Sequence, residues 1–196
     1  MCLSLVACQS SPYDFTDPLD NPRGVLPPGS VIELNQPLTF YPNSSRTRVQ
    51  NGKALGQSRY NMYTPSCEFY LYDTKESLVT TRTLEPDRFE VVSTYQGIEY
   101  VAAKPVDLAY GGVGMGVGTR WIGSPFNDDI GPVPFKTSMR VRSDRQPQLH
   151  EINCTALDDP WTRNYVSINQ IIQTLGEVAT VHIPESAFPS APESDQ

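Results

Sequence analysis

The chain has 196 residues and a net charge of −7, from 15 Lys and Arg against 22 Asp and Glu. This length suits one domain with a tail at each end, and the negative charge disfavours nucleic acid or anionic lipid as a partner. The 18 Pro and 13 Gly residues disfavour long helices and favour short elements joined by turns. No stretch approaches the roughly 20 apolar residues that span a bilayer.

The N-terminus contains a motif of lipid-modified proteins. Residues 5–8, LVAC, resemble the bacterial lipobox, whose cysteine receives diacylglycerol and becomes the mature N-terminus. The resemblance implies a signal-like segment over residues 1–8, lipidation at Cys8 and a flexible tether over residues 9–30. Gln9 in place of Asp then implies the outer membrane, facing the periplasm. The alternative is an ordinary N-terminal tail with a chance match.

Ten short runs rich in β-branched and aromatic residues predict strands. They lie at 31–34, 38–41, 47–50, 67–73, 78–82, 89–95, 98–103, 137–143, 149–155 and 178–183. Asn51-Gly52 predicts a tight turn, and residues 95–98 predict a hairpin connection. Because strands do not alternate with helices, we expect a mainly β fold. The prediction is a single domain over residues 31–183, an antiparallel β-sandwich or small barrel.

One segment has the period of a helix. Its apolar residues fall at i, i+3, i+4 and i+7, namely Ile168, Ile171, Ile172 and Leu175. Ser167 and Gln170 have the spacing of a capping box, and Gly176 has the place of a C-cap glycine. We expect an amphipathic helix over residues 167–175 that packs on the sheet. Residues 184–196 have the composition of a disordered tail.

The domain contains two cysteines, Cys67 and Cys154, since Cys2 and Cys8 belong to the signal-like segment. Neither lies in a CxxC or at metal-ligand spacing. Strand alternation places both on the inward face. We expect a Cys67–Cys154 disulfide, which fits an oxidising compartment such as the periplasm. The alternative is two buried free thiols.

The sequence contains few residues typical of catalysis. His150 and His182, its only histidines, lack a second ligand at metal spacing, and no Gly-x-Ser-x-Gly elbow is present. His150 most simply occupies an outward polar position of a strand. We therefore expect no enzymatic activity, no cofactor and no metal site. A triad assembled from distant residues is the alternative.

Two groups of residues are candidates for binding. In the run at 111–118, glycines alternate with apolar residues, which leaves a bare face that a ligand could approach, at Gly114 and Gly116 above all. The alternative is a mobile loop. Tyr70 and Tyr72 fall on the strand face opposite the inward cysteine, and tyrosine is enriched at interaction hot spots. The alternative is that these tyrosines cap a sheet edge.

Three segments resemble uncharacterised envelope proteins of gammaproteobacteria: YTPSCEF at 63–69, LEPDRFEV at 84–91 and MRVRSDRQP at 139–147. The resemblance implies the cysteine pair and the compartment, and it implies no activity. We therefore expect an outer-membrane lipoprotein, held at the periplasmic face by its lipid, that binds or scaffolds a protein partner in an envelope assembly. The alternatives are a β barrel or sandwich that binds a small ligand and is gated by residues 111–118, and an enzyme.

Overall fold

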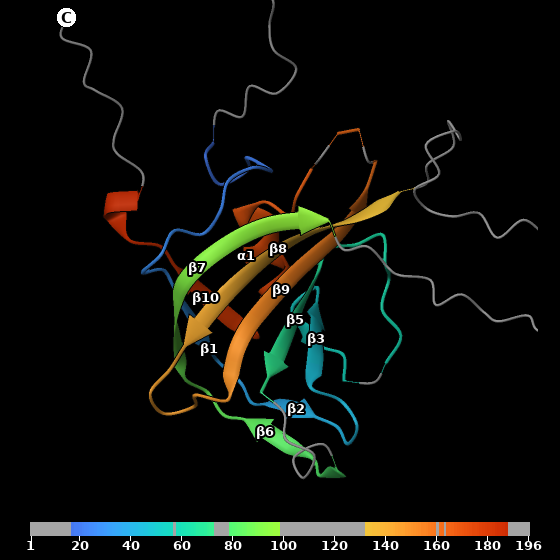
Figure 1. Ribbon diagram of the computed structural model, residues 1–196, viewed down its shortest axis with the longest axis vertical. Coiled ribbons are helices and arrows are strands. Elements are labelled where there is room, and N and C mark those ends of the chain that lie inside the picture. The colour runs from blue at the N-terminus through green and yellow to red at the C-terminus, as the bar shows by residue number, and fades with distance from the viewer. Residues whose placement is uncertain are drawn as a thin grey trace, which may run out of the picture.

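The structure is a computed structural model and describes residues 17–56, 58–72, 79–98, 132–159, 161–162 and 164–187. An eight-stranded antiparallel sheet, in the order β10-β1-β7-β8-β9-β5-β3-β4, forms most of it (Figure 1). The strands are β1 (Val31–Leu34), β3 (Arg46–Gln50), β4 (Lys53–Ala54), β5 (Ser66–Leu71), β7 (Arg88–Ile98), β8 (Val133–Arg142), β9 (Leu149–Asp158) and β10 (Ala179–His182). The strands β2 (Leu38–Phe40) and β6 (Arg82–Leu84) pair in a small second sheet.

The large sheet curls into a half-barrel, and the helix α1 (Ile168–Leu175) lies behind β7, β8 and β9 in the view of Figure 1. This arrangement confirms the prediction of a mainly β, antiparallel barrel-like fold with one late helix. The sheet face toward α1, called the inner face below, is apolar: Phe69, Met139 and Ile152 are fully buried there. Ile168 and Leu175 of α1 belong to the same core. Burial of each such side chain stabilises the fold by roughly 1.5–3 kcal/mol.

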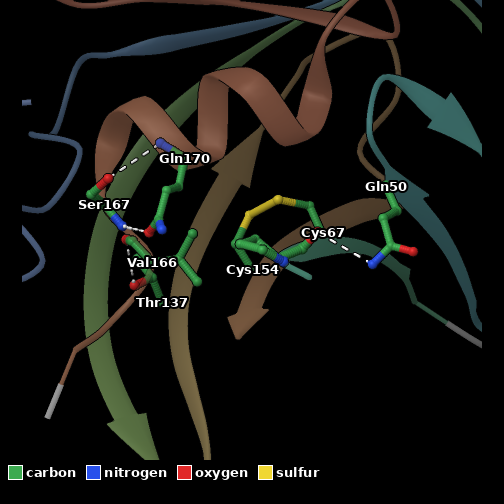
Figure 2. Close-up of a disulfide and its surroundings, with 8 residues drawn as sticks. Gln50, Cys67, Thr137, Cys154, Val166, Ser167 and Gln170 are labelled. Carbon is green, nitrogen blue, oxygen red and sulfur yellow. Dashed lines mark hydrogen bonds between the residues drawn. A yellow bond between two sulfur atoms is a disulfide. The ribbon is translucent and has the colours of Figure 1, made fainter. Parts of the chain in front are cut away.

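The ends of α1 agree with the sequence prediction. The Ser167 hydroxyl accepts a hydrogen bond from the Gln170 N–H (3.2 Å), and the Ser167 N–H donates to the Gln170 side chain (2.9 Å; Figure 2). At the other end, the Gly176 N–H donates to the Ile172 carbonyl (2.9 Å). Both predicted caps are therefore confirmed.

The predicted turn at Asn51-Gly52 is confirmed and joins β3 to β4. Both residues have positive φ, 51° and 70°, as a type I′ turn requires. The turn packs on the end of the helix, where the Gly52 N–H donates to the Thr174 carbonyl (2.9 Å). A Cβ at Gly176 would lie only 2.6 Å from the Gly52 Cα. The close approach of two backbones therefore explains both glycines.

Two strand predictions were wrong. β7 continues through Ile98, and residues 95–98 pair with β8 instead of turning. A turn there would have left the backbone N–H and C=O groups of residues 95–98 without the hydrogen-bond partners that β8 provides. The strand expected at 78–82 is instead the short β6, Arg82–Leu84. Of the strand expected at 98–103, residue 98 ends β7 and the rest lies outside the described residues.

The described part of the predicted tether, residues 17–30, lies against the sheet. Leu26 is fully buried, and its carbonyl accepts a hydrogen bond from the Thr94 hydroxyl (2.7 Å). The Leu19 carbonyl accepts from the Asn169 N–H at the start of α1 (3.0 Å). These bonds satisfy backbone groups that a free tether would leave to water. Residues 1–16 with Cys8, 99–131 with Gly114 and Gly116, and 188–196 lie outside the described residues.

The first described residues of the predicted C-terminal tail include a short 3-10 helix, η2 (Glu185–Ala187). Within the described ranges, no helix has the length and apolar character that a membrane crossing requires.

Candidate functional site

A disulfide joins Cys67 of β5 to Cys154 of β9, as the sequence predicts (Figure 2). The two cysteines are directly opposite in the register of these strands, with their Cα atoms 4.0 Å apart. Both side chains are fully buried on the inner face. The bond therefore fixes β5 against β9, the two strands that lead to the surface described next.

The outer face of the sheet, opposite α1, contains a cluster of charged groups around Glu68. The carboxylate of Glu68, whose side chain is only 11% exposed, forms ion pairs with Arg46 (3.2 Å) and Arg48. It also accepts a hydrogen bond from the Tyr70 hydroxyl (2.6 Å). The Arg48 guanidinium lies over the Tyr60 ring, 3.3 Å from its centroid. In this Glu68 cluster the buried carboxylate is fully paired, as burial of a charge requires.

Tyr70 holds its proton firmly in this cluster. Burial and the hydrogen bond to Glu68 raise the pKa of Tyr70 to about 12. At neutral pH its hydroxyl is therefore a fixed donor to Glu68. Tyr70 lies on the outer face, as predicted, and its hydroxyl group forms hydrogen bonds with Glu68 and Arg46 of the same sheet.

Two β-bulges flank β8 on this face. In the β7–β8 ladder, Val91 pairs with Val141 and Ser93 with Arg140, so Val92 is an extra residue. In the β5–β9 ladder, Leu71 pairs with Leu149 and Tyr70 with Glu151, so His150 is a second extra residue. Glu151 also pairs with Arg140, which places both bulges beside the same residue of β8. Bulges re-aim side chains and are common next to functional sites.

The bulges open a recess of about 350 Å³ on the outer face, called the bulge recess below. Val92, Arg140, His150 and Glu151 line it together with Tyr72, which follows β5. The Tyr72 and His150 rings stack with centroids 4.1 Å apart and an interplanar angle of 18°. Tyr72 is 66% exposed, so one face of this aromatic pair is available to a partner.

The recess also contains a cation, Arg140, that has no partner among the described residues. Arg140 is exposed and forms no ion pair or hydrogen bond through its side chain with any residue that the structure describes. Its neighbour Glu151 accepts a hydrogen bond from the Tyr95 hydroxyl (2.9 Å), and Tyr95 reaches across β8 to make it. The Glu151 carboxylate is thus directed toward Tyr95, while the Arg140 guanidinium remains available to an external anion.

Of the predicted binding residues, the structure places Tyr72 in the recess, Tyr70 in the neighbouring Glu68 cluster, and Gly114 and Gly116 outside the described residues. Sequence reasoning missed Val92 and Arg140. It placed His150 outward without giving it a partner. One signal was present: Leu149 and Ile152 are both apolar and three residues apart, which breaks the alternation of a regular strand.

The described residues include no group of three or more His, Cys, Asp and Glu side chains that could hold a metal ion. No protein-family model, curated protein or solved structure matches the chain.

Proposed function

We propose that this chain is a non-catalytic outer-membrane lipoprotein, lipid-anchored at the periplasmic face, that binds a partner protein of an envelope assembly through the bulge recess. The observation that carries the proposal is the pair of bulges beside Arg140. They place an apolar side chain, an aromatic stack and the Arg140 guanidinium, which no described side chain pairs with, in one depression. Tyr and Arg are the side chains enriched at interaction hot spots.

The chemistry of the recess favours an acidic side chain of the partner. The Arg140 guanidinium can donate two parallel hydrogen bonds to a carboxylate. The exposed Tyr72 ring supplies apolar contact area with little loss of side-chain entropy on binding. The buried Cys67–Cys154 disulfide supports the oxidising compartment of this proposal, and the lipobox-like residues 5–8 support the anchor.

Site-specific photo-crosslinking in living cells tests the partner. A photoreactive phenylalanine analogue replaces Tyr72, and as a control it replaces Trp161, which is 77% exposed and does not line the recess. We expect one reproducible adduct from position 72, none at that mass from position 161, and loss of the adduct when Arg140→Glu is added. Equal adducts from both positions, or an adduct that survives Arg140→Glu, would contradict the proposal.

The intact mass of the protein from the membrane fraction tests the anchor separately. We expect a chain that begins at Cys8 and carries acyl groups. An unmodified mass that begins at Met1 would rule out the anchor and would remove the support for the compartment that residues 5–8 give.

A further inference from the structure

A second cavity, of about 640 Å³, opens where β9 ends and α1 begins. It is separate from the bulge recess, with which it shares none of its described lining residues. Its volume lies within the range of roughly 300–1,000 Å³ that is typical of small-molecule sites. It is called the helix-end cavity below.

Two tyrosines provide the aromatic surfaces of the helix-end cavity, Tyr63 and Tyr165. The Tyr165 ring packs edge-on against the buried Phe135, with centroids 5.3 Å apart and an interplanar angle of 83°, so its orientation is fixed by the core. Tyr63 is 72% exposed, in a turn where its N–H donates to the Asn61 side chain (3.0 Å). Leu157 of β9 adds apolar surface.

The polar groups of this cavity are carboxylates and amides. Asp20 uses one carboxylate oxygen to accept from the Asn169 amide (2.7 Å), and Asp158 uses one to accept from the Asp159 N–H (2.7 Å). The second oxygen of each has no hydrogen-bond partner among the described residues. Gln170 accepts from the Ser167 N–H through its oxygen, and its amide N–H groups donate to no described residue. Acceptors and donors thus line one space.

The described groups that line this cavity disfavour anionic ligands and purely apolar ligands. Among the described residues that line it there is no Lys, Arg or His, so a phosphate, sulfate or carboxylate would meet two carboxylates and no cation of the described lining. The N-terminus of α1, at Ser167, contributes a partial positive charge of about half an elementary charge, which offsets part of the carboxylate charge and weakens the attraction for a cation. A purely apolar ligand would leave the carboxylates and amides desolvated and unpaired.

We infer that the helix-end cavity binds a neutral oligosaccharide. A pyranose ring has an apolar C–H face that packs flat on an aromatic side chain such as Tyr63. Its hydroxyl groups both donate and accept, so they can donate to Asp20 and Asp158 and accept from Gln170. This inference concerns a separate site and does not rest on the proposed function.

Titration of the purified full chain with neutral disaccharides, followed by protein NMR, tests the inference. The probes are cellobiose and N,N′-diacetylchitobiose, with the cationic, deacetylated chitobiose as a matched charged probe. At probe concentrations up to about 10 mM the titration detects a Kd near 1 mM. We expect at least one neutral disaccharide to bind, and to bind more tightly than chitobiose.

Variants locate the site. Tyr63→Ala removes an exposed ring and should weaken disaccharide binding by about tenfold or more. Tyr72→Ala removes a similarly exposed ring from the bulge recess and should leave it unchanged. Failure of both neutral probes to bind, equal binding to the Tyr63→Ala variant, or tighter binding of chitobiose would each overturn the inference. Backbone NMR spectra of both variants test whether they remain folded.

Discussion

Removal of the Cys67–Cys154 disulfide should cost a large part of the stability of this domain. The bond closes a loop with a sequence separation of 87 residues, for which the chain-entropy relation gives roughly 4.6 kcal/mol at 25 °C. Domains are typically stable by about 5–15 kcal/mol. At about 2–4 °C per kcal/mol for a chain of this size, we expect the melting temperature to fall by about 9–18 °C.

The assay is urea unfolding of Cys67→Ala, Cys154→Ala and the double variant, all in a background with Cys2→Ser and Cys8→Ser. Each single change already removes the crosslink, so the two singles and the double should lose similar free energies of unfolding. If the double variant loses the sum of the two single losses in free energy of unfolding, the reasoning is refuted. Losses from two independent cavities are additive, whereas one crosslink can be lost only once. A loss below about 1 kcal/mol in all three would refute the loop-entropy magnitude.

Three further outcomes follow from the geometry. Gly176→Ala should lower the free energy of unfolding by about 2 kcal/mol or more, because its Cβ would lie 2.6 Å from the Gly52 Cα and φ is +49°. The control Gly97→Ala, whose Cβ would have nothing within 4 Å, should lower it much less. Chemical denaturation measures both changes. Ser167→Ala should cost about 0.5–2 kcal/mol in the same assay, through loss of the cap. The difference in free energy of unfolding between the unchanged protein and Tyr70→Phe should be constant below pH 10 and should decrease between pH 10.0 and about 12. The decrease is expected because Tyr70 ionises at a lower pH in the unfolded chain than in the folded protein. A difference that stays constant over this pH range would contradict the raised pKa of Tyr70.

The parts of the fold that sequence predicted well are those set by neighbours along the chain. The helix with its Ser167 and Gln170 caps, and the turn at Asn51-Gly52, depend on contacts within a few residues. The inward cysteines followed from alternation within single strands. The prediction for residues 95–98 was wrong because Gly97 indicates a turn from its local sequence, whereas pairing with the distant strand β8 keeps it extended.

The candidate site was harder to predict, since it depends on how strands pair. The bulges beside Arg140 exist only relative to β8, and no single strand shows which residue is extra. Tyr72 could be assigned to the outer face from alternation, but its contact with His150 could not. Packing of residues 17–30 on the sheet was missed for the same reason: Leu26 lies in a Pro-rich segment with no strand or helix period, and its partners are distant in sequence.

The disulfide and the bulge at His150 are linked by register. With Cys67 opposite Cys154, alternation places Phe69 opposite Ile152 and Tyr70 opposite Glu151. Without an extra residue, His150 would then occupy the inner face and Leu149 the outer face. A bulge at His150 returns Leu149, which is 1% exposed, to the core and directs the imidazole toward Tyr72. Because a one-residue slip would exchange the two faces, a crosslink that fixes the register also keeps the aromatic stack on the outer surface.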